Sequence, residues 1–283
     1  RGSSVIKTMT AEYGAIEPIE QPSRRASSYG REDGAVMARF CSWPPRIAFL
    51  LVFLLSTLPP WLYALITDWC CFCSQRSPDG RRGRGRFVGW IVSSCWRLAF
   101  RTCCWLRIET SGLDRLEHAG GQGRQIFVGV NHVTWLDTAL VCAFLPPSLV
   151  GDMKTLMDRK HLGLPIIGRI ANAVGHMPVP FTSRTRGQFS VDRDRMQATM
   201  ERVDAHISTG GHLIIFPEGQ MNSAWRTLLP FRAGGMELCI RHDMEVWGWV
   251  IAGAADCWPE SAAVGGSPAT LRMLAAPLYP SAR

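Results

Sequence analysis

The sequence predicts an α/β fold, a mixed sheet flanked by helices, preceded by N-terminal membrane-associated helices. After residue 108, short apolar runs alternate with amphipathic stretches, which is the pattern of strands and helices in one layered domain. Before that point, residues 47–66 form an uncharged apolar run. The whole net charge of +8 also lies in the first 107 residues, and a basic segment beside an apolar one favours contact with anionic lipid.

These patterns divide the chain into three parts. Residues 1–46 are rich in Ser, Gly, Pro, Glu and Arg and have no sustained apolar period, so we expect a disordered N-terminal arm. Residues 47–107 contain the apolar run and a second amphipathic stretch, so we expect them to attach the chain to a membrane. Residues 108–283 should form the globular domain.

The apolar run 47–66 would be about 30 Å long as a helix, which matches the hydrocarbon layer of a bilayer. Pro59 and Pro60 interrupt it, so it is either one kinked span or a re-entrant hairpin. The double proline disfavours a buried helix of a soluble domain. More arginines follow the run than precede it, and the positive-inside rule then places the rest of the chain in the cytosol.

The stretch 87–107 predicts a helix lying in the headgroup layer, with Trp90, Trp96 and Trp105 as interfacial anchors. At helical spacing its polar and apolar residues separate onto opposite faces. The polar face holds Arg86, Ser93, Ser94, Arg97 and Arg101, and the apolar face holds Val88, Val92, Cys95, Ala99, Cys103 and Leu106. The alternative is an amphipathic helix packed on the core of the protein.

Several buried elements are predicted in the globular part. Apolar runs predict strands at 125–130, 213–216 and 246–251, and a short fourth strand at 271–274 before Pro277. Residues 192–209 predict a helix that Gly210 and Gly211 end.

The composition also excludes some classes. No nucleic-acid motif accompanies the basic segment, so we expect no nucleic-acid partner. The ten cysteines lie at irregular spacings, without the paired Cys/His pattern of a zinc site, and the chain is longer than a disulfide-stabilised secreted domain. We therefore expect no metal and free thiols, with Cys70, Cys71 and Cys73 as possible palmitoylation sites beside the membrane.

The clearest chemical signal is the segment 131–137, Asn-His-Val-Thr-Trp-Leu-Asp, at the end of the first strand. Thr134 can cap a following helix, with Asp137 in the capping-box position. A tight turn then separates His132 from Asp137, so their side chains can meet. A carboxylate on one imidazole nitrogen raises the basicity of the other, and the pair could take a proton from a hydroxyl. Alone, the spacing also fits a structural histidine beside a helix cap.

A second signal is Phe216-Pro217-Glu218-Gly219 at the end of the second strand. Such a turn places the Glu218 carboxylate over the edge of the sheet, where it could accept hydrogen bonds from a polyol. The alternative is a plain surface turn.

Together, the two segments resemble the motifs of the glycerolipid acyltransferase family, which includes the 1-acylglycerol-3-phosphate acyltransferases. The resemblance covers roughly residues 87–280 and identifies 108–283 as the acyltransferase domain. Between and after the motifs, segments that also look like the family are Lys154 with 164–168, 175–179, 229–234 and Trp258-Pro259.

The resemblance implies that His132 deprotonates an acceptor hydroxyl, which attacks an acyl thioester of coenzyme A or acyl carrier protein, while Asp137 orients His132. Glu218 and Gly219 would belong to the acceptor site. It implies no cofactor, no metal and no covalent acyl-enzyme. The expected acceptor is lysophosphatidic acid, and the expected location is a membrane, that of the endoplasmic reticulum, with the catalytic domain facing the cytosol.

The sequence departs from the family where arginines usually bind the acceptor phosphate. Pro180-Phe181 and Gln220-Met221 stand in those places, and Glu245 and Gly248 stand where prolines are common. An anionic headgroup still needs a cation. The candidates are Lys154, Arg184, Arg186, Arg226 and Arg232, of which we expect Lys154 and Arg232 to bind substrate.

Other functions stay open at this point. The acceptor could be another lysophospholipid or glycerol 3-phosphate. The protein could be a hydrolase in which His132 activates water, or a membrane-binding domain without catalysis, although intact His132, Asp137 and Glu218 argue against the last.

Overall fold

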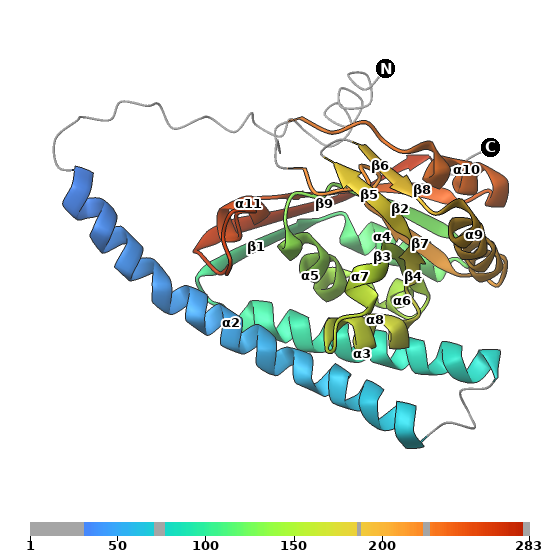
Figure 1. Cartoon of the computed structure of the whole chain (residues 1–283), viewed down its shortest axis with the longest axis horizontal. Helices are drawn as coiled ribbons and strands as arrows, with labels where there is room; N and C mark the ends of the chain where they lie inside the picture. Colours follow the sequence, from blue (N-terminus) through green and yellow to red (C-terminus); the bar gives the residue numbers. More distant parts are fainter. Residues whose placement is uncertain (1–30, 71–76, 186–187, 223–226, 280–283) are drawn as a thin grey trace. The chain divides into compact units, whose positions relative to one another are not determined.

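The computed structural model describes residues 31–70, 77–185, 188–222 and 227–279 (Figure 1). The chain divides into two units, Arg1–Cys41 and Ser42–Arg283. The second unit contains the whole sheet and the helices that cover it. Residues 1–30 of the expected disordered arm lie outside the described residues.

The centre of the second unit is a seven-stranded sheet in the order β1-β9-β8-β2-β7-β3-β4. All neighbouring strands are parallel except β8 and β9, which are antiparallel, so the predicted mixed sheet is confirmed. The strands are β1 (Leu106–Ser111), β2 (Ile126–Val130), β3 (Met153–Asp158), β4 (Met177–Val179), β7 (His212–Ile215), β8 (Glu245–Ala252) and β9 (Ala269–Tyr279). A separate hairpin joins β5 (Phe181–Thr185) and β6 (Gln188–Val191).

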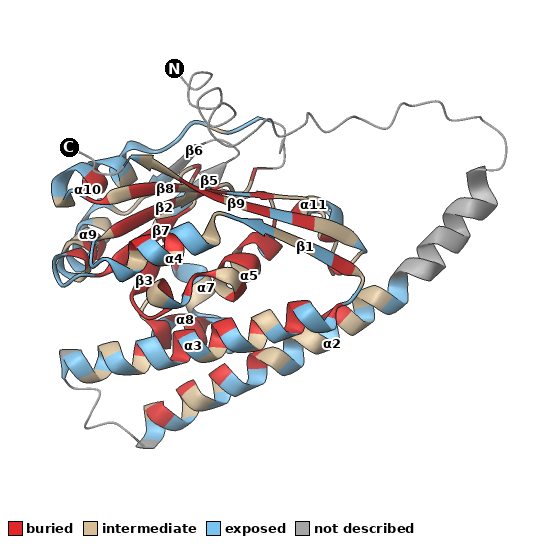
Figure 2. Cartoon of the chain, turned by 180° about the vertical axis from the view of Figure 1, so that it is seen from behind, coloured by how far each residue is buried: buried red, intermediate tan, exposed pale blue. Residues whose placement is uncertain are grey.

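Helices cover both faces of this sheet (Figures 1 and 2). On one face, α9 and α10 enclose a core with Phe127 and Leu213. On the other face, α4, α5, α6 and α8 pack on the alternate residues Ile126, Val128 and Val130. Strand β2 is therefore buried on both faces, as a continuous apolar run predicts. These helices and the short α7 and α11 span Leu113–Gly121 (α4), Trp135–Phe144 (α5), Pro147–Val150 (α6), Arg159–Leu162 (α7), Ile167–Val174 (α8), Arg193–Ser208 (α9), Ala233–His242 (α10) and Ala254–Cys257 (α11).

The fourth predicted strand is longer than expected. Strand β9 continues from Ala269 through Pro277 to Tyr279, whereas the proline was expected to follow the strand. Its partner β1 ends at Ser111, which pairs with Leu274, so β9 is open on that side beyond Leu274. Proline is tolerated on such an edge because it removes no hydrogen bond from a ladder.

The apolar run belongs to one long helix, α2 (Arg31–Cys70), which continues through Pro59 and Pro60. The re-entrant hairpin is therefore wrong. The helix also begins inside the expected disordered arm, so residues 31–46 are helical. Residues Trp43–Trp69 are long and apolar enough to cross a membrane by length and composition.

Two faces of α2 are apolar. One face packs inside the protein, where the ring of Phe53 lies 4.9 Å from that of Phe100 and Phe49 is 2% exposed. The other face is exposed and repeats at helical spacing. Its members are Trp43, Ile47, Leu50, Leu51, Leu54, Leu55, Leu58, Leu62, Ile66 and Trp69. In a structure without a bilayer, this exposed stripe is the surface that lipid would cover.

The second amphipathic stretch forms α3 (Pro78–Thr102), and its apolar face lies in the core instead of in a headgroup layer. Val88, Val92 and Ala99 are buried. On the face expected to be polar, Arg97 Nε donates to the carbonyl oxygen of Ala143 at 2.8 Å. The alternative of a helix packed on the core is thus the correct one, because residues of the apolar face belong to the main hydrophobic core.

The three tryptophans of this stretch differ in exposure and contacts. Trp90 is 46% exposed and remains available to an interface. Trp96 is 9% exposed and donates to Thr57 Oγ1 of α2, and Trp105 donates to the carbonyl oxygen of Gly266. Trp96 and Trp105 are therefore core residues and not interfacial anchors. Residues 42–107 and 108–283 belong to the same compact unit.

Candidate active site

His132 lies in the short turn between the end of β2 at Val130 and the start of α5 at Trp135. The Thr134 side chain accepts from the backbone N–H of Leu136 at 2.8 Å and caps α5, and Asp137 completes a capping box. This cap folds the chain back on itself within one turn, which brings the carboxylate of Asp137 under the ring of His132.

The two side chains that the sequence pairs do meet. His132 Nδ1 lies 3.2 Å from Asp137 Oδ2. Asp137 is fully buried, and the same oxygen accepts from the backbone N–H groups of Val133 at 2.6 Å and Thr134 at 2.8 Å. A buried carboxylate at Nδ1 favours the tautomer with its proton on that nitrogen, which leaves Nε2 with a free lone pair. The side chain of His132 is 14% exposed, so part of the ring is open to solvent.

Phe216, the first residue of the second motif, stacks on His132. The ring centroids are 4.0 Å apart and the planes differ by 20°. Phe216 directly follows β7, the parallel neighbour of β2, so the two motifs meet at the carboxyl ends of adjacent strands. In open α/β sheets this edge is where ligands bind.

Glu218 lies inside the protein and not in a plain surface turn. It is 1% exposed, and its carboxylate accepts from three groups. These are the backbone N–H of His132 at 3.4 Å, the side-chain amide of Asn222 at 2.8 Å and the backbone N–H of Leu229 at 2.9 Å. The carboxylate therefore ties the turn of His132 to the segment after the second motif. Gly219 has φ +72°, which lets the chain turn directly after Glu218.

Two asparagines complete this arrangement, and the sequence did not single out their roles. The amide of Asn131 both donates to the carbonyl oxygen of Ile251 at 2.9 Å and accepts from its N–H at 2.8 Å, which extends the pairing of β2 and β8 by one residue. The backbone N–H of Asn222 donates to the carbonyl oxygen of His132 at 2.7 Å. The position of Asn131 directly after a strand could have indicated its bond, whereas nothing in the sequence around Asn222 could have.

Lys154 is not among the residues gathered around His132. It pairs with Leu213 near the beginning of β7, whereas His132 and Glu218 follow the ends of their strands. Leu213, the partner of Lys154, precedes Glu218 by five residues, which is about 16 Å of extended chain. The ammonium group of Lys154 donates to the carbonyl oxygen of Gly151 at 3.2 Å, and burial lowers the pKa of Lys154 to about 8. The family-like position of Lys154 in sequence did not reveal the register of β3.

Arg232 lies beside the second motif, because its backbone N–H donates to the carbonyl oxygen of Pro217 at 2.9 Å. It is the exposed residue that precedes α10. Arg186 and Arg226, like the side chain of Arg184, lie outside the described residues.

The site therefore combines one histidine with a free ring nitrogen, a buried carboxylate behind it, and a stacked aromatic ring. Among the described residues, no group of three or more His, Cys, Asp or Glu side chains is arranged to hold a metal ion. The groups present can accept a proton from a hydroxyl and later return it to a leaving group.

Comparisons with known proteins identify the family and the fold. The family model described as Acyltransferase matches residues 107–252, which include both motifs. No curated protein matches the sequence. Among solved structures, the fold is similar to that of the 1-acyl-sn-glycerophosphate (LPA) acyltransferase PlsC from Thermotoga maritima, with a TM-score of 0.60 and 14% sequence identity. That similarity covers 84% of this chain and 88% of the other.

Proposed function

Because this chain belongs to the acyltransferase family, we propose that it transfers a fatty acyl group from acyl-CoA or acyl carrier protein to the free hydroxyl of lysophosphatidic acid. The product is phosphatidic acid. The observation that carries this proposal is the His132–Asp137 pair, 3.2 Å apart, at the sheet edge where the two motifs meet.

The reaction moves one proton from the acceptor hydroxyl to His132 and then from His132 to the leaving thiolate. Nε2 of His132 takes the hydroxyl proton as the oxygen attacks the thioester carbonyl. The tetrahedral intermediate then collapses, the carbon–sulfur bond breaks, and the thiolate leaves with the proton from the imidazolium. Asp137 stabilises that imidazolium and keeps the ring in the productive tautomer. No covalent acyl-enzyme and no metal takes part.

The choice of acceptor rests on two supports. The fold resembles that of a protein named as a lysophosphatidic acid acyltransferase. The motifs at His132 and Phe216 also resemble those of enzymes that act on 1-acylglycerol 3-phosphate. Another lysophospholipid or glycerol 3-phosphate would use the same chemistry at the same histidine.

The exposed apolar stripe of α2 supports a membrane location for this reaction. Lipid acceptors reside in bilayers, so a stripe buried in lipid would hold the site at its substrate. We propose the endoplasmic reticulum as the membrane. We place the catalytic domain on its cytosolic side because more arginines follow the apolar run than precede it.

A radiolabelled acyl-CoA assay tests the proposal on the full chain in detergent, with lysophosphatidic acid, other lysophospholipids, glycerol 3-phosphate and no acceptor. We expect release of thiol that depends on the acceptor and is greatest with lysophosphatidic acid. Pretreatment with a strong chelator should leave the rate unchanged. Free fatty acid released without an acceptor would indicate a hydrolase in which His132 activates water.

A further inference from the structure

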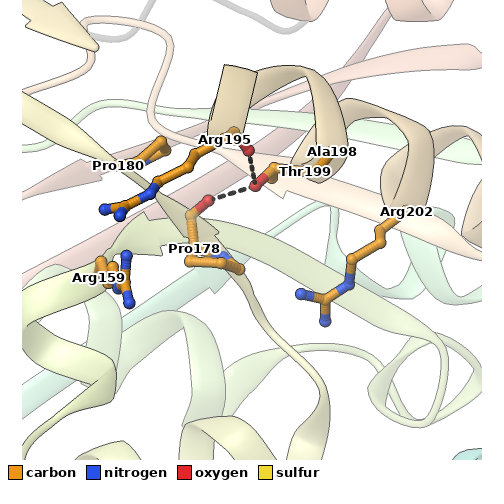
Figure 3. Close-up of a pocket in the computed structure, with 7 residues that line it drawn as sticks. All are labelled: Arg159, Pro178, Pro180, Arg195, Ala198, Thr199 and Arg202. Atoms are coloured by element: carbon orange, nitrogen blue, oxygen red, sulfur yellow. Dashed lines mark hydrogen bonds between the residues drawn. The ribbon is translucent and has the colours of Figure 1, made fainter. Parts of the chain in front are cut away.

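Three arginines line one hollow beside the carboxyl edge of the sheet. The hollow has a volume of about 340 Å³ and is lined by Arg159, Pro178, Pro180, Arg195, Ala198, Thr199 and Arg202 (Figure 3). Arg195 and Arg202 lie on α9 at a spacing of seven residues, so both project from the face of that helix next to β4. Arg159 directly follows β3. None of these arginines was singled out from the sequence.

Thr199, which lines the hollow, forms two hydrogen bonds to backbone carbonyl groups. Figure 3 shows Thr199 bonded to the carbonyl oxygen of Pro178, at 2.9 Å, and to that of Arg195, at 3.2 Å. Thr199 is 3% exposed, and its bond to Pro178 holds α9, which carries Arg195 and Arg202, against β4.

The hollow is level with His132 along the strands. Strand β3 runs parallel to β7, and Arg159 directly follows the end of β3, so it lies at the same edge of the sheet as Glu218, which follows β7. The register of β2 and β7 in turn places Glu218 beside His132. Strand β3 is two places from β2 in the sheet, which is about 10 Å. An extended substrate is long enough to cross that separation.

Among the residues that the structure describes, only one of the three arginines is paired with an acid. Arg195 lies 3.4 Å from the carboxylate of Asp192, and the Arg195 side chain is 65% exposed. Among the described residues, Arg159 and Arg202 form no ion pair with an acidic side chain. Arginines gathered in this way suit a phosphate group, which accepts several N–H bonds at once.

We propose that Arg159, Arg195 and Arg202 bind a phosphate group of one of the two substrates. The proposal rests on the proposed acyl transfer. It supplies cations that the sequence lacks at Phe181 and Met221, and Pro180 in the wall of the hollow directly precedes Phe181. The phosphate belongs either to the lysophospholipid acceptor or to the coenzyme A donor, and its chemistry is the same in both.

The test compares Arg195→Gln, Arg202→Gln and the double variant with Arg193→Gln in the full chain. Arg193 is an exposed arginine of the same helix that does not line the hollow, so it controls for the loss of a surface charge. KM and kcat are measured for lysophosphatidic acid and uncharged monoacylglycerol as acceptors, and for acyl-CoA and acyl-pantetheine as donors. Calorimetric titration with glycerol 3-phosphate and with coenzyme A measures binding without turnover.

Loss of one phosphate contact should raise KM for the phosphate-bearing substrate by roughly 10-fold or more and change kcat little. A rise for lysophosphatidic acid but not monoacylglycerol assigns the hollow to the acceptor. A rise for acyl-CoA but not acyl-pantetheine assigns it to the donor. If KM and binding in the double variant equal those of Arg193→Gln, the proposal is wrong. If the wild type binds either probe through these arginines but transfers no acyl group, only the proposed function fails.

Discussion

At the scale of the residue, His132 is held by its backbone as well as by its ring. Glu218 accepts from its N–H, and the backbone N–H of Asn222 donates to its carbonyl oxygen. Asp137 and Phe216 fix the ring. A catalytic group held in this way keeps its geometry before substrate arrives, and such positioning raises the rate.

The kcat and KM of a Glu218 variant distinguish a role in positioning His132 from a role in binding the acceptor. Glu218→Gln replaces one acceptor oxygen with an NH₂ group, which cannot accept from the N–H donors around it. We expect kcat to fall by roughly 10-fold or more with little change in KM for the acceptor, because the turn of His132 loses its support. Glu237→Gln, an exposed site on α10, is the matched control. A raised KM with normal kcat would instead make Glu218 a ligand of the acceptor.

The contact of His132 with Asp137 could be predicted from sequence because both lie within one turn and a helix cap brings them together. The burial of Glu218 could not, since the groups that surround it come from Asn222 and Leu229 in a segment whose path depends on tertiary packing. The misplacement of Lys154 has a similar cause. Sequence gives the strand but not its register, and the register decides which end of the sheet a residue occupies.

At the scale of the element, α3 shows what periodicity leaves open. Its amphipathic pattern predicts a helix correctly, but lipid and protein are both apolar, and only the packing shows which one covers the apolar face. Gly85 and Gly89 allow the helix to approach closely: an added Cβ would lie 2.8 Å from the carbonyl oxygen of Val174 and 3.0 Å from that of Val150, respectively. Both neighbours are backbone atoms and cannot simply rotate away.

This contact predicts opposite effects for two similar glycines. Gly85→Ala should destabilise the protein by about 1–3 kcal/mol, because α3 must move away from α8. Gly83→Ala is the control, since no atom lies within 4 Å of its added Cβ. It should be neutral or stabilising by up to about 1 kcal/mol, because alanine favours a helix more than glycine does. Thermal unfolding in detergent measures both. Equal melting temperatures for the two variants would contradict the packing of α3.

At the scale of the whole molecule, the exposed stripe of α2 predicts how the chain is attached. A buried apolar segment resists salt and carbonate, whereas attachment by charge does not. The wild type should therefore stay in the membrane pellet until detergent is added. Replacing Leu51, Leu55 and Leu58 together by lysine should release a folded protein, because these side chains are exposed and outside the core.

Ile240→Lys changes an equally exposed residue of α10 and should leave the protein in the pellet. Truncation is a poorer test, because the opposite face of α2 packs on the core through Phe49 and Phe53. Full solubility of the wild type at physiological salt would contradict membrane attachment by this helix.

The central claim is that His132 is the base in acyl transfer, and the turnover of His132→Ala in the assay with lysophosphatidic acid tests it most directly. The exchange should lower kcat by roughly 10²-fold or more at an unchanged melting temperature. Asp137→Asn should have a milder but still severe effect, because it removes the charge and the orientation while Nε2 remains. Near-normal turnover by a folded His132→Ala protein would contradict the account.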